Sequence, residues 1–435
     1  MALTNTPKMP FHVAVCGGGI GGLCTAIGLL HNNVPCTLYE SAAAFEEIGA
    51  GVSFGPNAIR AMNLLDPEIK IGYDRIATKN AWPEKQKFWF DFNLGMKEEA
   101  WEKTGMKAPG KDGLRVAQVV AGDVGQCSVH RAHFLDVLVK LIPEGVAKLG
   151  KRVENVEKKG EKMVLTFGDG THAEADAVIG CDGVKSRTRQ ILLGESHENT
   201  DPTFTGKYAY RGLIPMEKAV EVLGDELARN AQMHMGHHGH VLTFPIENGR
   251  TMNVVAFRTK DGEWGNEKWV LPMKKEDMFR DFAGWGDSVM SILPLMEKPD
   301  VWALFDHPPA PTYYKGCLAI LGDAAHASTP HQGAGAGQAI EDAYIISNLL
   351  GQVDSVDDIE KAFKAYDTIR RPRSQKVVTT SRDASYIYEF EDETLGSDLK
   401  MIKETLEKRY DWIWDEDMPN QLEQAQNVMA LKRNL

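Results

Sequence analysis

Two segments far apart in the chain hold residue types that bind and use a dinucleotide. The first is Gly17-Gly18-Gly19-Ile20-Gly21-Gly22. In this G-x-G-x-x-G pattern, Gly17 permits a tight turn, Gly19 lets the backbone approach a pyrophosphate, and Gly22 lets a helix pack closely on a strand. The second is Gly322-Asp323-Ala324-Ala325-His326, which places a carboxylate in a glycine-led turn. The first segment predicts a dinucleotide site, and the second offers an acceptor for a ligand hydroxyl.

The residues around the first segment fit a strand, a turn and a helix that bind phosphate. The apolar run Phe11–Cys16 predicts a buried parallel strand, and Leu23–Leu30 predicts a helix. The N-terminus of that helix would offer free N–H groups and a positive dipole end to phosphate. Thr37–Glu40 predicts the next strand. Its final residue, Glu40, lies close to the roughly 20-residue spacing of an acid that binds ribose hydroxyls, so we expect it to hold an unphosphorylated ribose.

A histidine stands just before the glycine run that follows the second segment. The run Gly333–Gly337, which includes Gly335 and Ala336, leads into a predicted helix over Gln338–Leu350. N–H groups and the helix dipole at such a position stabilise negative charge. Because an imidazole titrates near neutral pH, His331 is a candidate general base. The alternative is a turn histidine that hydrogen-bonds the backbone.

Composition and charge exclude several classes of protein. The chain has 435 residues and a net charge of −12, and its pI is about 5.6. Such acidity opposes a nucleic-acid-binding surface. No stretch reaches the roughly 18 apolar residues of a membrane span. The six cysteines are scattered without a C-x-x-C pair. We expect a cytoplasmic enzyme, a monomer or a homodimer, without nucleic-acid or membrane partners.

Four histidines stand close together at His234, His237, His238 and His240. A metal site needs ligands that converge in space, and the dinucleotide chemistry expected here needs no metal. We therefore predict no metal site. The segment is interpreted as a strand, a turn and a strand that carry incidental histidines, with His240 as the one that can face a pocket.

The order of elements predicts a discontinuous domain with a second domain inserted. Single cores stop growing at roughly 250 to 300 residues, so a chain of this length is expected to hold two domains. Alternating strands such as Lys207–Ile214 and Val241–Ile246 predict an antiparallel sheet. The expected fold class is α/β, with a Rossmann-like dinucleotide-binding domain, an inserted mixed or antiparallel β-sheet substrate domain, and a helical C-terminus. The predicted boundaries are 1–82, 115–195 and 300–370 for the dinucleotide-binding domain, 83–114 and 196–299 for the sheet domain, and 371–435 for the helical segment.

Three motifs in this order make the chain resemble the flavin-dependent aromatic hydroxylases of the 4-hydroxybenzoate hydroxylase type. They are the fingerprint Gly17–Gly22, the segment Gly180-Cys181-Asp182-Gly183-Val184-Lys185-Ser186, and Gly322–His326. The resemblance runs through nearly the whole chain. Within that family the chain resembles the salicylate hydroxylases, on the segments Gly49–Ala58, Tyr208–Gly212, Phe282–Asp287 and Pro330–Gln338.

The resemblance implies an FAD-binding domain of the GR2 type and names its contacts. FAD would be held by Gly51, Arg131, Asp182 and Asp323 together with the fingerprint, with Asp323 on a ribityl hydroxyl and Gly335–Ala336 at the pyrimidine edge. It implies NADH as a transient reductant, and the chain carries no second strand–G-x-G-x-x-G–helix unit. It also implies that O2 reacts with reduced flavin to a C4a-hydroperoxide, which attacks an electron-rich ring.

A salicylate substrate would need a base for its phenol and a cation for its carboxylate. His331 is the candidate base. Arg250, between two predicted strands, and Arg211, at the end of Lys207–Tyr210, are the candidate carboxylate partners. Arg250 could instead be a solvated turn residue, and Arg211 could gate the flavin. Hydroxylation at the carbon that bears the carboxylate would release CO2 and leave catechol.

Other functions are also compatible with these residues. One is hydroxylation of another phenolic acid or phenol without loss of CO2, and another is dearomatising hydroxylation of a polyketide phenol. A third, from a different class, is a flavin-binding redox sensor without monooxygenase activity.

Overall fold

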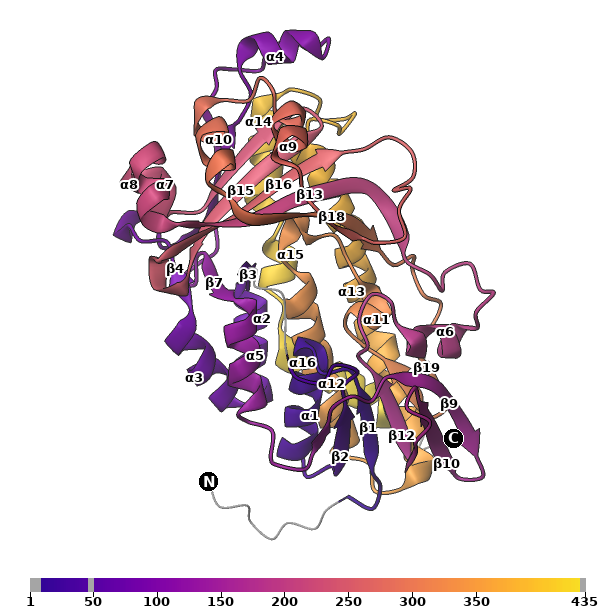
Figure 1. Cartoon of the computed structure of the whole chain (residues 1–435). Coiled ribbons are helices and arrows are strands. Elements are labelled where there is room, and N and C mark those ends of the chain that lie inside the picture. The colour runs from indigo at the N-terminus through magenta and orange to yellow at the C-terminus, as the bar shows by residue number, and fades with distance from the viewer. Residues whose placement is uncertain (1–8, 46–50, 431–435) are drawn as a thin grey trace.

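Two large β-sheets occupy opposite ends of the molecule (Figure 1). The computed structural model describes residues 9–45 and 51–430. Each sheet has its own apolar core, one built around the strands of the fingerprint and the other around the inserted strands. The chain therefore has two hydrophobic cores, as expected from its length.

The first sheet is six-stranded, in the order β19-β20-β12-β1-β2-β8. All of its neighbouring pairs are parallel except β19 with β20. Every residue of β1 is buried, as in a strand covered on both faces. The strands are β1 (Val13–Cys16), β2 (Cys36–Tyr39), β8 (Ala147–Lys148), β12 (Ala177–Gly180), β19 (Tyr314–Lys315) and β20 (Leu318–Ile320).

Helices and two small sheets surround the six-stranded sheet. Helix α1 follows β1 directly and packs against α12, which follows the turn after β20. The helices are α1 (Ile20–His31), α2 (Pro56–Leu65), α3 (Pro67–Ile76), α5 (Arg131–Val139), α6 (Arg187–Leu193), α11 (Asp323–His326) and α12 (Gly335–Leu350). The small sheets are β3 (Gly51–Ser53), β7 (Cys127–His130) and β4 (Thr78–Lys79), and β11 (His172–Ala175), β10 (Lys162–Phe167) and β9 (Val153–Lys159).

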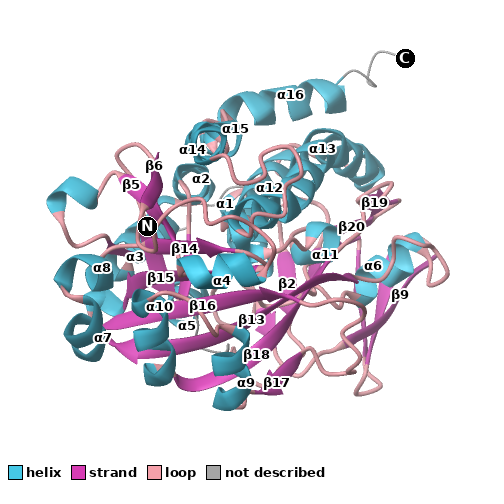
Figure 2. Cartoon of the chain, turned by 90° about the horizontal axis from the view of Figure 1, so that it is seen from above, coloured by secondary structure: helices cyan, strands magenta, loops and turns pink. Residues whose placement is uncertain are grey.

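The second sheet is eight-stranded, in the order β17-β18-β13-β16-β15-β14-β5-β6, and only the β14–β5 pair is parallel. In Figure 2 the short helices α7 (Met216–Leu223), α9 (Lys275–Asp281) and α10 (Asp287–Ile292) lie along one side of its strands, and the long helices lie on the other. The strands are β5 (Phe88–Leu94), β6 (Arg115–Val120), β13 (Thr203–Pro215), β14 (Gln232–Gly236), β15 (Gly239–Ile246), β16 (Thr251–Thr259), β17 (Val270–Pro272) and β18 (Glu297–Asp306).

Three of the predicted domain boundaries need correction. Strand β6 begins at residue 115 but pairs with β5, so it belongs to the eight-stranded sheet. Strand β18 continues past residue 300 because it pairs with β13. Helix α13 (Ile359–Tyr388) runs through residue 371 and contains Pro372. A proline in a helix interior usually breaks the helix, but residues on both sides of Pro372 are buried and keep this one continuous.

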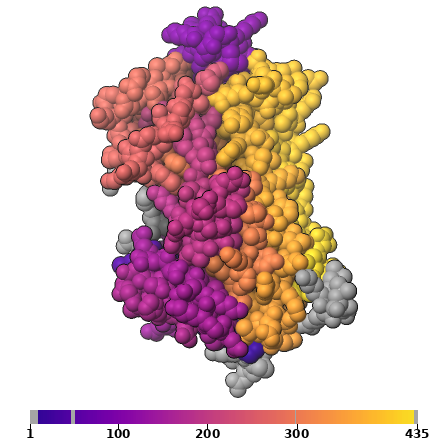
Figure 3. Space-filling model, turned by 90° about the vertical axis from the view of Figure 1, so that its right-hand side faces the viewer, coloured from indigo at the N-terminus to yellow at the C-terminus, as the bar shows by residue number. Residues whose placement is uncertain are grey.

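The C-terminal helices run along one edge of the molecule and connect its two ends. In Figure 3 this yellow segment extends from the eight-stranded sheet to the other domain. Helix α14 (Leu399–Lys408) packs beside β6, α15 (Asp411–Trp414) beside α2, and α16 (Met418–Ala430) beside α13 and α12. None of the helices in the described part of the chain is both long and apolar enough to span a membrane.

A buried ionic network joins α12 to α13. Arg370 is fully buried, and its guanidinium donates to Glu341 at 2.7 Å and to Asp342 at 2.8 Å. Arg373 adds a second cation on Glu341 at 2.8 Å. Burial by itself would raise the pKa of Asp342, but His326 and Arg370 lower it to about 2. Two carboxylates and two guanidinium groups therefore balance each other inside the protein.

Replacing Arg370 by methionine would leave two carboxylates buried beside a single remaining cation. We expect R370M to lower the free energy of unfolding by about 3–5 kcal/mol, measured by urea unfolding followed by circular dichroism. The control is Lys403→Met, which breaks the exposed pair with Glu407 on α14 and should cost about 0.5 kcal/mol or less. Equal losses in the two variants would contradict the importance of the buried network.

Candidate functional site

A cavity of about 420 Å³ lies where the two domains meet. One part of its wall consists of the fingerprint turn and the N-terminal end of α12, and the other part consists of apolar side chains from the eight-stranded sheet. Eight of the predicted site residues line it: Gly19, Gly51, Arg131, Arg211, Asp323, His331, Gly335 and Ala336.

The fingerprint glycines have the geometry that phosphate binding requires. Gly17 has φ +112°, and a Cβ there would overlap the carbonyl oxygen of Cys181. A Cβ at Gly22 would overlap the carbonyl oxygen of Gly17. By contrast, nothing lies within 4 Å of the position that a Cβ on Gly19 would occupy. Thus Gly17 and Gly22 allow the turn to close, and Gly19 opens the backbone to the cavity.

Glu40 lies at the end of β2, beside the fingerprint turn. Its carboxylate accepts a hydrogen bond from the N–H of Gly18 at 2.6 Å and another from the N–H of Ala42 at 2.7 Å. Glu40 itself does not line the cavity, and its contact with a ribose stays a prediction.

Asp182 lies in the loop that follows β12. Its carboxylate accepts hydrogen bonds from the Ser186 hydroxyl at 2.6 Å and from the N–H of Thr188 at 2.9 Å. The residues on either side, Cys181 and Gly183, line the cavity, whereas Asp182 does not. The Asp182 carboxylate therefore shapes the loop that lines the cavity, and its contact with the cofactor stays a prediction.

The turn after β20 brings Asp323 and the start of α12 to the same wall. Asp323 is exposed to the cavity at the first position of α11. Gly335 and Ala336 form the first turn of α12, whose first intrahelical hydrogen bond runs from Gln338 to Ala334. N–H groups before that bond have no helical acceptor, so the turn can bind an anionic edge of a ligand.

Gly51 and Arg131 complete the wall from the small sheet and α5. The N–H of Gly51 donates to the Asn253 side chain at 3.0 Å, which fixes β3 against the eight-stranded sheet. Arg131 is the first residue of α5. Gly49 and Ala50, which belong to the same predicted motif as Gly51, lie outside the described residues.

His331 lies in the cavity wall and is almost completely buried. Burial, and then the neighbouring His240, hold its pKa well below 6.5, so the imidazole is neutral at neutral pH. Neither of its ring nitrogens has a hydrogen-bond partner within the described part of the chain. The same is true of Thr329 Oγ1 and Gln332 Nε2, which belong to two other lining residues. Orphaned buried polar atoms are costly, at about 1–3 kcal/mol each, so this wall is built to meet a ligand or water.

Arg211 brings a positive charge into the apolar part of the cavity. It lies on β13 with its guanidinium 4.8 Å from the centre of the Trp302 ring. No ion pair or hydrogen bond is formed by its guanidinium with any residue that the structure describes. Burial, and then the charge of Arg131, lower its pKa to about 10, so it stays protonated at neutral pH. An unpaired, half-buried guanidinium that lines an apolar cavity is a suitable partner for a ligand carboxylate.

Arg250 is not part of this site, which corrects the prediction that it is a carboxylate partner. It is exposed in the turn between β15 and β16, and its Nε donates to the backbone oxygen of Glu247 at 3.2 Å. Its position matches the alternative of a solvated turn residue. Trp302, which faces Arg211, was missed from the sequence because no local pattern marks an aromatic residue on β18 as lining a cavity.

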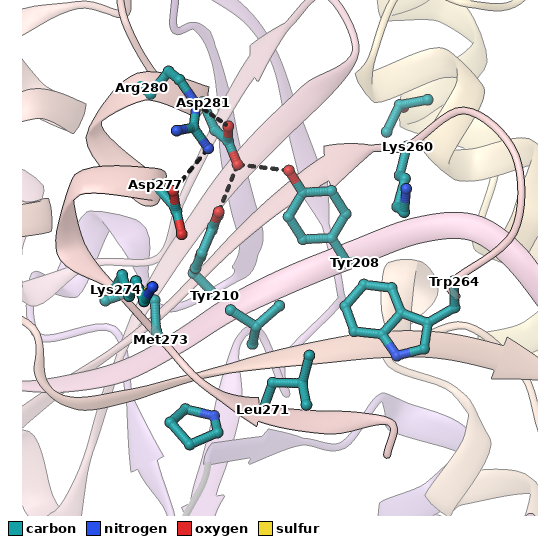
Figure 4. A pocket seen from close by; sticks show the side chains of 13 residues that line it. Tyr208, Tyr210, Lys260, Trp264, Leu271, Met273, Lys274, Asp277, Arg280 and Asp281 are labelled. Atoms are coloured by element: carbon teal, nitrogen blue, oxygen red, sulfur yellow. Dashed lines mark hydrogen bonds and ion pairs between the residues drawn. The ribbon is translucent and has the colours of Figure 1, made fainter. Parts of the chain in front are cut away.

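The opposite face of the eight-stranded sheet carries a second hollow of about 360 Å³ (Figure 4). There, the hydroxyls of Tyr208 and Tyr210 both donate to Asp281, at 2.6 and 2.5 Å. Successive residues of a strand point to opposite faces, which is why these tyrosines lie here and Arg211 lies in the main cavity. The sheet itself therefore separates the two hollows.

The four clustered histidines do not converge. His234 is buried on β14, His237 and His238 form the turn, and His240 is buried on β15. Across residues 9–45 and 51–430, no group of three or more histidine, cysteine or carboxylate side chains is placed to hold a metal ion.

The residues present fit FAD. The cradle at Gly19 and the N-terminus of α1 suit a pyrophosphate, Asp323 suits a polyol hydroxyl, and the first turn of α12 suits the electron-rich edge of a ring system. His331 and Arg211 stand further along the same cavity, beside apolar side chains of the sheet. The cavity thus has one part for a dinucleotide and one for a small, partly apolar molecule.

Comparisons with known proteins show relatives that are FAD-dependent monooxygenases. Residues 147–381 match a family model described as an FAD binding domain. The 6-methylsalicylate 1-monooxygenase of Aspergillus terreus is 45% identical over 423 residues, which cover 96% of this chain and 92% of that protein. A salicylate hydroxylase of Pseudomonas putida is 39% identical over 439 residues, which cover 98% and 96%.

Solved structures give the same result. A salicylate hydroxylase substrate complex superposes with a TM-score of 0.85 at 38% identity, covering 96% of this chain and 98% of that one. Klebsiella pneumoniae HpxO, complexed with FAD and uric acid, has a TM-score of 0.74 at 21% identity and shares the fold.

Replacing Asp323 by alanine should weaken FAD binding without unfolding the protein. Loss of a charge-assisted hydrogen bond worth about 1.5–3 kcal/mol corresponds to about a 10- to 100-fold rise in Kd, measured by the fluorescence of free FAD at equilibrium. Asp277→Ala, in the second hollow, is the matched control and should leave FAD affinity unchanged. Normal FAD affinity in D323A would show that this carboxylate does not contact the cofactor.

Proposed function

The chain belongs to the family of FAD-dependent aromatic monooxygenases that contains salicylate hydroxylase, and we propose that it converts salicylate to catechol with release of CO2. O2 is the oxygen source and NADH the transient reductant. The observation that supports this proposal is the presence of an unpaired cation, Arg211, and a neutral imidazole, His331, in one largely apolar cavity.

Bound FAD supplies the oxygen chemistry, and the protein supplies position, charge and exclusion of water. Asp323, the fingerprint turn and the first turn of α12 hold the cofactor along one wall of the cavity. Apolar side chains of the sheet, such as Phe244 and Phe257, exclude water from the other wall. A substrate between these walls is held close to the cofactor ring.

Arg211 orients the substrate by its carboxylate. A guanidinium binds a carboxylate through two parallel hydrogen bonds, which fixes direction as well as position. With the carboxylate held, the ring carbon that bears it is presented to the oxygen donor. Hydroxylation there makes this carbon tetrahedral, and loss of CO2 restores the aromatic ring.

His331 removes the proton of the phenol. A phenolate is a much stronger carbon nucleophile than a phenol, so the ring must be deprotonated before it is attacked. The lowered pKa keeps the His331 imidazole unprotonated at neutral pH, so a ring nitrogen is free to receive the proton, and the imidazolium then releases that proton readily. The partnerless nitrogens of the imidazole are the atoms available for that transfer.

A second candidate substrate is 6-methylsalicylate. The observation in its favour is the 45% identical relative of Aspergillus terreus, whose name gives this substrate. The cavity wall carries apolar side chains that a methyl group could contact, including Met233 and Leu242. One methyl group changes specificity by about 10- to 200-fold.

The compartment follows from the thiols. All six cysteines are free, and four of them are buried. Unpaired cysteines in an apolar core are typical of a reducing environment. We therefore place the protein in the cytoplasm, where NADH is available.

Replacing His331 by alanine should lower kcat by about 100-fold or more at neutral pH, because general-base catalysis contributes about 10²–10⁴-fold. The loss should shrink as the pH rises, since the phenol then ionises without help. The measurement is substrate-dependent NADH oxidation and O2 uptake across pH 6–10. An unchanged pH profile with full activity would remove the assigned role, and bound FAD serves as the control for folding.

Replacing Arg211 by methionine should raise the Kd of salicylate by about 30- to 100-fold, since a bidentate ion pair of about 2–3 kcal/mol is lost. Binding of phenol, which has no carboxylate, should change little. The measurement is ligand-induced perturbation of flavin absorbance in oxidised enzyme. Arg250→Met is the matched control, and an equal effect of R250M would contradict the assignment.

Release of CO2 tests the reaction itself. With salicylate labelled in the carboxylate, label should leave as CO2 in proportion to NADH consumed, and catechol should be the product. A hydroxylated product that keeps the label would favour the alternative of hydroxylation without decarboxylation. A panel containing 6-methylsalicylate would then rank the two candidate substrates by kcat/KM.

A further inference from the structure

A line of polar side chains leads from His331 to the protein surface. The ring centres of His240 and His331 are 5.1 Å apart. His240 Nδ1 is 2.8 Å from a carboxylate oxygen of Glu389, the residue that follows the last residue of α13. Both His240 and Glu389 are completely buried. The carboxylate and the two imidazoles thus form the inner part of the line.

Two side chains connect Glu389 to a second carboxylate nearer the surface. The hydroxyl of Thr259 lies 2.9 Å from Glu389 and 2.8 Å from Glu391. The ammonium of Lys207 pairs with Glu389 and also lies 2.7 Å from Glu391. Glu391 in turn lies 2.6 Å from Nδ1 of His238, whose side chain is 51% exposed. The line therefore reaches water at His238.

The side chains of this line have a net charge that allows them to take up one proton. Lys207 carries one positive charge, and Glu389 and Glu391 carry one negative charge each. Burial would raise the pKa of Glu389, but the hydrogen bond from His240 and the charge of Lys207 hold it below its usual range. Burial lowers the pKa of His240, which is therefore neutral at rest. With both imidazoles neutral, the group has one excess negative charge, which an incoming proton would neutralise.

The inner end of the line is incomplete without a ligand or water. His240 Nε2 has no hydrogen-bond partner in the described part of the chain, and neither do the two ring nitrogens of His331. Two buried rings at this separation, each with an unsatisfied nitrogen, are explained if a substrate hydroxyl or a water molecule lies between them.

Other groups around the line are held in fixed positions. The Tyr388 hydroxyl donates to the backbone oxygen of His331 at 3.2 Å, and the Tyr386 ring lies 5.5 Å from the Lys207 ammonium. At the surface, the His237 ring lies against His238, and Arg258 donates to the backbone oxygen of His237 at 3.2 Å. Burial lowers the pKa of His237 to about 4, so it adds no charge.

Two residues beside the outer part of the line, His238 and Phe390, have left-handed backbone conformations. His238 has φ +57° and Phe390 has φ +53°, values that are uncommon for residues other than glycine. The N–H of His238 donates to the backbone oxygen of Glu389 at 3.2 Å, so the turn is tied to the end of α13. Conformations of this kind are kept where the surrounding structure requires them.

We propose that His240, Glu389, Thr259, Glu391 and His238 form a relay that carries the phenol proton from His331 to solvent. This inference rests on the proposed function, in which His331 accepts that proton. His331 passes the proton through a bridging water molecule to His240 Nε2, and His240 releases its Nδ1 proton to Oε1 of Glu389. The Glu389 carboxyl group then turns so that its proton reaches the Thr259 oxygen, as the Thr259 hydroxyl donates to Glu391. Glu391 passes a proton to His238, which releases it to water, so one proton leaves the phenol and one enters solvent.

The relay can be tested without turnover. Oxidised holoenzyme, in the absence of NADH, is mixed with 5-nitrosalicylate, and formation of the coloured phenolate is followed by stopped-flow absorbance. We expect Glu389→Gln to slow phenolate formation by about 10-fold or more, because an amide cannot take up and release the proton. The variants His238→Asn and Glu391→Gln, nearer the surface, should also slow it, with partial rescue of H238N by added imidazole.

Two controls separate this relay from general effects on folding and from the base itself. Glu297→Gln, on β18 of the same sheet, removes an exposed ion pair with Lys218 of α7. This variant should leave the rate unchanged. If H331A slows phenolate formation but E389Q, E391Q and H238N do not, the relay is wrong and the base assignment stands. If H331A also forms phenolate at the normal rate, the assigned role of His331 fails as well. Because H238N and E391Q change partly exposed side chains, they test the relay even if E389Q does not fold.

Discussion

The position of α12 depends on the buried pairing of Arg370 with Glu341 and Asp342. Asp342 also contacts His326 Nε2 at 2.6 Å and accepts from the N–H of Gly322 at 3.1 Å, so the same carboxylate holds the turn that presents Asp323. Charges buried in this way stabilise a fold only when every partner is present. One network therefore sets both the direction of the α12 N-terminus and the position of Asp323, and His326 is part of it.

Local patterns predicted the elements near the fingerprint well. Strand β1 spans Val13–Cys16 within the predicted Phe11–Cys16, and α1 spans Ile20–His31 around the predicted Leu23–Leu30, as expected from their apolar residues. The predictions were wrong where tertiary pairing decides. Strands β6 and β18 belong to the inserted sheet because they pair with β5 and β13, and α13 continues through Pro372 because both of its halves are buried. Such pairings join residues that no sequence window contains.

The same contrast applies to the site. His331, Asp323 and the first turn of α12 belong to one sequence segment, so their shared wall could be inferred from that segment. Arg211 and Arg250 were both candidates for the carboxylate partner until the structure separated them: Arg211 faces the cavity from within β13, and Arg250 lies in an exposed turn. Glu389 carries no motif, and it meets His240 only across 149 positions of sequence. Buried polar networks of this kind depend on packing that a single sequence does not display.

Helix α13 has a consequence for the way the molecule holds together. Its 30 residues extend for about 45 Å at a rise of 1.5 Å per residue. Arg370, near its middle, is anchored in the cofactor domain, and Glu389, at its end, meets the inserted sheet. Each half of the protein therefore depends on the other for folding, because residues of α13 belong to the hydrophobic cores of both. Local unfolding of α13 at one end would disturb the packing at its other end, so cofactor loss and rearrangement of the substrate pocket should occur as one cooperative event.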